Sequence, residues 1–172
     1  MASTLPRRFL ACVGALAAGG LLAASGAVAA HAKGEYYQWN SSASPLSISG
    51  YGSTAKGYGQ WRLADGSSGT RSFLDARLWY TNADNHTVYA DLSTQGDCEK
   101  NTDGSYSCGA YVTDYGAETP HYNVSNTWAW KYANTAIDEI SSRHRARILV
   151  CLDVPLRVDP CAGPAYAGPS YS

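Results

Sequence analysis

Apolar and polar residues alternate along most of the chain between residues 73 and 154. Segments 73–80 (FLDARLWY), 88–92 (VYADL) and 144–154 (HRARILVCLDV) each place aliphatic residues at every second position. A period of two predicts β-strands with one buried face, and short polar turns separate these segments. No long amphipathic helix pattern interrupts them, so the sequence predicts an all-β fold, an antiparallel β-sandwich of the Ig-like or jelly-roll-like kind. The residues predicted to face inward are Leu74, Ala76, Leu78, Tyr80, Val88, Ala90, Leu92, Ala146, Ile148, Val150, Leu152 and Val154.

Two other segments extend this prediction. Trp128, Trp130 and Tyr132 share one face by the same alternation, and because long aliphatic residues are scarce we expect them to belong to the core. Segment 134–144 (NTAIDEISSRH) is the one place where a short helix is expected. We assign the sandwich to residues 33–161, followed by a loose C-terminal tail over 162–172 that is rich in Gly, Pro and Ser.

The first 32 residues are typical of a secretory signal peptide. Arg7 and Arg8 precede an uncharged run over residues 11–30, and Ala-x-Ala cleavage sites follow it. A membrane anchor is the alternative, but the run consists mostly of Ala and Gly. We therefore expect a secreted, extracellular protein that does not span a membrane after cleavage. Without Arg7 and Arg8, 11 Lys and Arg face 14 Asp and Glu, an acidic balance that argues against a nucleic-acid partner.

The cysteines of the mature chain form two pairs with the same spacing. Cys98 and Cys108, and likewise Cys151 and Cys161, have nine residues between them. A metal site would need closer pairs or nearby histidines, and a redox site would need C-x-x-C. In an exported domain an even number of cysteines predicts disulfides, for which four cysteines allow three pairings. The turn sequence 101–105 (NTDGS) favours the two local pairings.

Several segments together resemble a group of small, uncharacterised secreted actinobacterial proteins. They are 50–61 (GYGSTAKGYGQW), 74–92 (LDARLWYTNADNHTVYADL) and 147–161 (RILVCLDVPLRVDPC). The resemblance covers about residues 51–161. It implies a secreted, disulfide-bearing β-sandwich and supplies no activity, cofactor or catalytic residue.

Three candidate binding surfaces follow from the strand pattern. Trp79 and Tyr89 are expected on the outside of the sheets beside Arg77 and Asp91, as a surface for sugar rings or a protein. An arginine stripe could bind a polyanion, or simply keep an outer or edge strand from pairing with other chains. The segment between Cys151 and Cys161 presents Arg157 near its apex, either as a protease-inhibitor-like loop or as a structural clasp. The residues of the stripe are Arg143, Arg145 and Arg147.

Catalytic and metal sites are weakly indicated. The sequence lacks G-x-S-x-G and H-E-x-x-H, and the histidines at 86, 121 and 144 occur in unrelated contexts, so no catalytic residue and no cofactor are expected. A calcium site is conceivable where oxygen-bearing residues alternate, although the EF-hand pattern is incomplete. We expect a binding or interaction function at the cell envelope or in the extracellular space, with a polysaccharide or an extracellular protein as partner. An inhibitor and an unrecognised hydrolase are the alternatives. The calcium candidates are Asp97, Glu99, Asn101 and Asp103.

Overall fold

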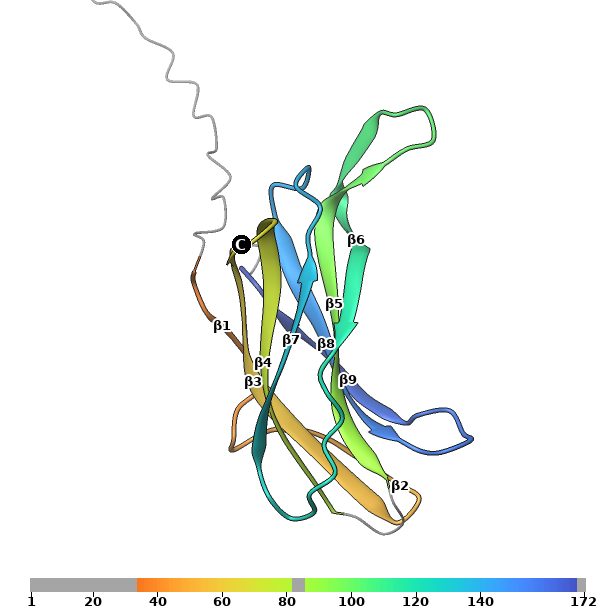
Figure 1. Cartoon of the computed structure of the whole chain (residues 1–172). Helices are drawn as coiled ribbons and strands as arrows, with labels where there is room; N and C mark the ends of the chain where they lie inside the picture. The colour runs from red at the N-terminus through yellow and green to blue at the C-terminus, as the bar shows by residue number, and fades with distance from the viewer. Residues whose placement is uncertain (1–33, 82–85, 170–172) are drawn as a thin grey trace, which may run out of the picture.

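The computed structural model describes residues 34–81 and 86–169, which form two antiparallel sheets packed face to face (Figure 1). The expected signal peptide and residues 170–172 lie outside the described residues. The described part of the chain contains no helix, and therefore no helix that could cross a bilayer. The strands are β1 (Tyr37–Trp39), β2 (Leu46–Gly50), β3 (Ser53–Gly66), β4 (Gly69–Thr81), β5 (Thr87–Lys100), β6 (Tyr106–Glu118), β7 (Ala129–Ala136), β8 (His144–Asp153) and β9 (Cys161–Ala167).

The first sheet has five strands and the second has four. In the first, which we call the β3–β4 sheet, the order is β1-β3-β4-β7, and β2 pairs with the same edge of β3 as β1. The second, the β5–β8 sheet, has the order β6-β5-β8-β9. Every pairing is antiparallel, which confirms the predicted β-sandwich.

The core lies between the sheets and contains the residues predicted to face inward, all of them buried. Its largest side chains are Trp39, Trp61 and Tyr80, each no more than 1% exposed. Trp61 Nε1 donates a 2.7 Å hydrogen bond to Ser72 Oγ, which also accepts from Thr94 Oγ1 of the opposite sheet. The buried polar groups of Trp61, Ser72 and Thr94 therefore have partners, whereas Trp39 Nε1 and the Tyr80 hydroxyl are buried without one among the described residues.

A glycine on β3 sets how closely the sheets approach. A Cβ atom on Gly57 would lie 2.6 Å from Val150 Cγ2 on β8 and 3.0 Å from Leu78 Cδ2. Real Cβ atoms do not come this close to a neighbour, so only glycine fits without repacking.

Both local disulfides are present, as predicted. Cys98 is bonded to Cys108 and Cys151 to Cys161, and each bond joins directly opposite residues of neighbouring strands. The first closes the β5–β6 hairpin, whose turn at 101–105 is held by a 2.8 Å bond from Asn101 N to Ser105 O. In Figure 1 this hairpin and the β8–β9 loop extend from opposite ends of the sandwich.

Three expectations about the C-terminal half are wrong. Trp130 and Tyr132 are 42% and 61% exposed on the outer side of β7, because the small residues Ala133 and Thr135 face the core instead. The expected helix over 134–144 is absent, since β7 continues to Ala136 and an irregular connection leads to β8. Residues 162–167 of the expected loose tail belong to β9 and pair with β8.

Candidate functional site: the aromatic face of the β3–β4 sheet

Outward-facing side chains of β3, β4 and β7 meet in rows that run across the sheet. The Cα partners of Arg77 are Tyr58 on one side and Trp130 on the other. In the row on one side of Arg77, Asp75 lies between Gln60 and Tyr132. In the row on the other side of Arg77, Lys56 lies opposite Trp79. We call this surface the aromatic face. Its rings are those of Tyr58, Phe73, Trp79, Trp128, Trp130 and Tyr132.

Three of the rings touch one another and form a cluster. The ring centroids of Tyr58 and Trp128 are 5.2 Å apart in an edge-to-face arrangement, and Trp79 lies 6.2 Å from Trp128. Such geometry is favourable for aromatic pairs and keeps the rings in place. Trp130 and Tyr132 are more exposed, so part of this surface is available to a ligand.

Cationic side chains are interleaved with the rings. Arg77 Nη1 donates a 3.2 Å hydrogen bond to the Tyr58 hydroxyl, and its Cζ lies 5.8 Å from the centre of the Trp130 ring. Lys56 Nζ lies 4.8 Å from the centre of the Trp79 ring. Each cation therefore lies over the negative face of an aromatic ring, which attracts it electrostatically.

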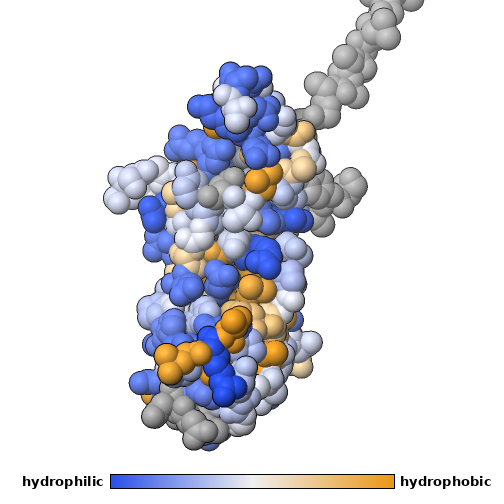
Figure 2. All heavy atoms as spheres, turned by 90° about the vertical axis from the view of Figure 1, so that its right-hand side faces the viewer, coloured by the Kyte–Doolittle hydropathy of each residue, from blue (hydrophilic) through white to orange (hydrophobic). Residues whose placement is uncertain are grey.

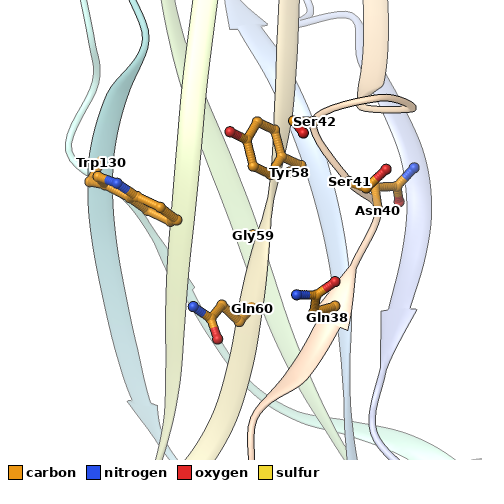
Figure 3. Close-up of a pocket in the computed structure, with 8 residues that line it drawn as sticks. All are labelled: Gln38, Asn40, Ser41, Ser42, Tyr58, Gly59, Gln60 and Trp130. Carbon is orange, nitrogen blue, oxygen red and sulfur yellow. The ribbon is translucent and has the colours of Figure 1, made fainter.

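A groove of about 170 Å³ opens on this face beside Trp130 (Figure 3). Figure 3 shows Trp130 on one side and Gln38 and Asn40 on the other, with Tyr58 and Gln60 between them. The wall combines two aromatic rings with amide and hydroxyl groups that can donate and accept hydrogen bonds. The lining residues are Gln38, Asn40, Ser41, Ser42, Tyr58, Gly59, Gln60 and Trp130.

The outward positions of these three strands carry an excess of positive charge. Asp75 is their one carboxylate among the described residues. Burial raises the pKa of Asp75 above its ordinary value, and the nearby Arg62 partly opposes this. The cations at outward positions of β3 and β4 are Lys56, Arg62, Arg71 and Arg77.

The predicted common surface of Trp79 and Tyr89 is wrong. Both residues face outward, but Trp79 and Arg77 lie on β4 whereas Tyr89 and Asp91 lie on β5, in the other sheet. Tyr89 is only 8% exposed. Its hydroxyl donates a 2.9 Å bond to Asp159 Oδ2 and its ring stacks on His121, with centroids 4.7 Å apart. The structure therefore gives Tyr89 a structural role.

The arginine stripe lies on the outer side of the β5–β8 sheet. β8 pairs with strands on both sides, so the interpretation of an edge strand is wrong. The Arg145 guanidinium lies between Tyr111 and Tyr166, 4.0 and 4.4 Å from their ring centres, and its Nε donates to Gln95 Oε1. Burial, followed by the charge of Glu118, raises the pKa of Asp91, and the positive charge of Arg147 lowers it by less. Arg145 thus has partners within the sheet, and Arg147 lies opposite Ser93 and Tyr166 in the strand register.

The β8–β9 loop projects from the sandwich and has an apolar tip. Leu156 and Val158 are 105% and 89% exposed. Figure 2 views the molecule from the right of Figure 1, and there hydrophobic residues gather in the lower half. Arg157 N donates to Val154 O in a tight turn, and its guanidinium lies 4.8 Å from the Tyr51 ring centre. The left-handed Leu156 (φ 63°) makes this a turn rather than an extended segment, which disfavours an inhibitor-like role.

Three of the calcium candidates make hydrogen bonds in two different places. Asp97 is buried and accepts hydrogen bonds from Arg143 N and Ser142 Oγ, while Asp103 accepts from Ser105 in the hairpin turn. Asn101 also bonds within that turn. Within residues 34–81 and 86–169 no group of three or more His, Cys, Asp or Glu could hold a metal ion, and a calcium site at these four residues stays a prediction.

The histidines at 86, 121 and 144 lie in separate surroundings. His86 Nδ1 contacts Ser53 Oγ, His121 Nδ1 lies 2.9 Å from Asp153 Oδ2, and His144 Nε2 lies 2.7 Å from Asp138 O. None of these pairs is part of the aromatic face.

The groove residues Gln38, Tyr58 and Gln60 were not predicted from the sequence. A sequence signal exists for two of them, because Tyr58 and Gln60 alternate with Gly57, Gly59 and Trp61, which are buried.

Comparison with known proteins adds no further guide: no protein-family model, curated protein or solved structure matches the chain.

Proposed function

We propose that the protein is exported and binds a glycan, at the cell envelope or in the extracellular space, on the aromatic face of its β3–β4 sheet. The observation that carries this proposal is the groove in which Trp130 and Tyr58 lie beside Gln38, Asn40 and Gln60. The C–H groups of a sugar ring pack against aromatic faces, and its hydroxyls exchange hydrogen bonds with side-chain amides. A glycan needs both kinds of group at one place.

Export is supported by the signal-like N-terminus and by the two disulfides, which persist in oxidising compartments. Exposure of aromatic rings supports the binding face. The exposed parts of Trp130 and Tyr132 contribute nothing to burial in the single chain, but would do so under a bound sugar ring.

A panel of soluble polysaccharides in affinity electrophoresis tests the proposal. The wild-type protein should be retarded by at least one polymer, and Trp130→Ala should weaken that retardation about tenfold, as loss of one stacking ring implies. Tyr166→Ala is the matched control, because Tyr166 is 50% exposed on the other sheet. If no polymer retards the protein, or if both variants lose binding equally, the aromatic face is not a glycan site.

The same experiment separates the alternatives. A hydrolase would shorten the retarding polymer during incubation, which end-group analysis detects. An inhibitor acting through the β8–β9 loop would suppress a trypsin-like protease in a manner that depends on Arg157 and not on Trp130.

A further inference from the structure

We infer that the glycan bound by the aromatic face is acidic, a polymer whose sugar rings bear carboxylates, and that Arg77 binds the carboxylate. This inference rests on the proposed function and names its ligand class. The first observation is the charge of this surface. The outward positions of β3 and β4 carry one carboxylate, that of Asp75, and four cations, which are Lys56, Arg62, Arg71 and Arg77. The chain as a whole has a net charge of −1, so positive charge is concentrated on this face.

Arg77 is placed at the centre of the rings. It is the cross-strand partner of both Tyr58 and Trp130, which line the groove. The hydrogen bond to the Tyr58 hydroxyl and the Trp130 ring hold its guanidinium in one orientation. A sugar ring stacked on Trp130 would therefore bring its substituents next to a fixed guanidinium.

The charge of Arg77 is incompletely compensated within the protein. Its Nε is buried and has no hydrogen-bond partner among the described residues, and no described carboxylate lies within ion-pair distance of Arg77 or Lys56. A guanidinium carries five N–H donors in a planar fork that matches a carboxylate. Since Nη1 donates to the Tyr58 hydroxyl, other N–H donors of the terminal nitrogens remain for a ligand.

Lys56 supplies a second positive charge along the same strand. Lys56 and Tyr58 are two residues apart on β3 and so face the same side, roughly 7 Å from each other. Lys56 Nζ lies over the Trp79 ring. The row of Tyr58 and Arg77 separates Lys56 from Gln60. The two cations thus form a short line beside the ring cluster, which suits a polymer with a carboxylate on successive rings better than a single acidic group.

The Asp75 carboxylate limits where such a ligand can lie. Asp75 is in the row next to Arg77, between Gln60 and Tyr132. A ligand carboxylate placed there would be repelled, so the neutral edge of the sugar is expected over Gln60 and its acidic edge toward Arg77 and Lys56.

Two polymers that differ only in their charge test the inference: short oligogalacturonides and their fully methyl-esterified form, which keeps the rings and removes the carboxylates. Binding is measured by titration calorimetry at low salt. The wild-type protein should bind the acid at least about tenfold more tightly than the ester, the difference typical of a charge-assisted bidentate contact.

Variants assign the effect to Arg77. Arg77→Gln should reduce affinity for the acid to that for the ester, while affinity for the ester changes less than about twofold. Arg77→Lys keeps the charge but loses the fork, and should fall between the two. Arg147→Gln, on the outer side of the other sheet, should bind as the wild type does. Circular dichroism and thermal melting confirm that each variant is folded.

The outcomes separate the inference from the proposed function. Equal binding of acid and ester, with both weakened by Trp130→Ala, would overturn the acidic ligand and keep the glycan site. Binding of a neutral polysaccharide alone would have the same meaning. A preference for the acid that survives Arg77→Gln but is lost in Arg147→Gln would place the carboxylate on the other sheet and overturn the assignment. If no glycan binds, both proposals fail.

Discussion

The phenol of Tyr89 fastens the β8–β9 loop to the outside of β5, and its removal is a direct test of this structural role. The Tyr89 hydroxyl donates to Asp159 Oδ2 at 2.9 Å, and the other carboxylate oxygen of Asp159 accepts from Val154 N at 3.0 Å. Tyr89→Phe deletes this hydrogen bond and keeps the ring that stacks on His121. A hydrogen bond to a charged group contributes about 1.5–3 kcal/mol, and because water can replace part of it at the half-buried Asp159, we expect a loss of about 1–2 kcal/mol at pH 7.

A pH dependence accompanies this loss. Burial, followed by the hydrogen bond to Asp159, raises the pKa of Tyr89 well above its ordinary value of 10.0. Below pH 10 the phenol is protonated in both states and its contribution to stability is constant. Above pH 10 the unfolded chain ionises first, so it binds fewer protons than the folded chain and stability falls as the pH rises. The wild type should therefore lose stability above pH 10 more steeply than Tyr89→Phe.

Urea unfolding followed by circular dichroism at pH 7, 9, 10 and 11, with the disulfides intact, measures both effects. Tyr132→Phe is the control, because its ring is 61% exposed. Burial also raises the pKa of Tyr80, and that of Tyr37 rises to about 12, but both contributions remain in every variant and cancel in the comparison. An unchanged midpoint at pH 7 together with an unchanged alkaline slope would refute the structural role of Tyr89.

Three further predictions concern stability. Trp61→Ala should cost about 3–5 kcal/mol in denaturant unfolding, and Trp130→Ala far less, because Trp61 is fully buried and Trp130 is 42% exposed; equal losses would mean that Trp130 belongs to the core. Gly57→Ala should cost about 1–3 kcal/mol through overpacking against Val150, so a melting temperature equal to that of the wild type would contradict the close approach of the sheets. Cys151→Ser should lower the free energy of unfolding by about 2–4 kcal/mol relative to the oxidised wild type. Reduction of the wild type breaks both disulfides, so the loss in Cys151→Ser should not exceed the loss that reduction causes.

The strands and disulfides could be predicted because their signals are local. Alternation specifies a strand wherever one face is buried, and a turn between two cysteines brings them together without reference to the rest of the fold. In β8 the aliphatic residues leave no doubt about which face is inside, and the prediction for Ile148 and Val150 is confirmed.

The face of β7 could not be predicted in this way. Alternation shows that Trp130 and Tyr132 lie on one side, but not whether that side faces the core. The choice depends on the space between the sheets, and here the small residues Ala133 and Thr135 occupy the inner side of β7, where Ala133 lies opposite Leu74 of β4. Hydrophobicity alone therefore gives the wrong answer.

The composition of the site depended on topology. Trp79 and Tyr89 are both outward-facing, as expected, but whether they share a surface depends on how β4 and β5 are joined. Consecutive strands pair or neighbour one another in about two thirds of cases. Here β4 pairs with β3 and β7 while β5 pairs with β6 and β8, so the chain crosses between sheets after Thr81. Nothing in the sequence marks this crossing.

The same topology places a charge among the exposed rings of the aromatic face. β7 is an edge strand of its sheet, and exposed aromatic residues on an edge favour pairing with other chains. Arg77 in the adjacent row carries a charge between Tyr58 and Trp130, so a second apolar surface cannot cover these rings without desolvating that charge. The proposed acidic glycan would escape this penalty, because its carboxylate would supply a partner for the charge. The Arg77 charge that would attract the ligand thus also opposes self-association. We therefore expect Arg77→Gln both to weaken binding to the acid and to increase self-association. Sedimentation at increasing protein concentration measures the self-association.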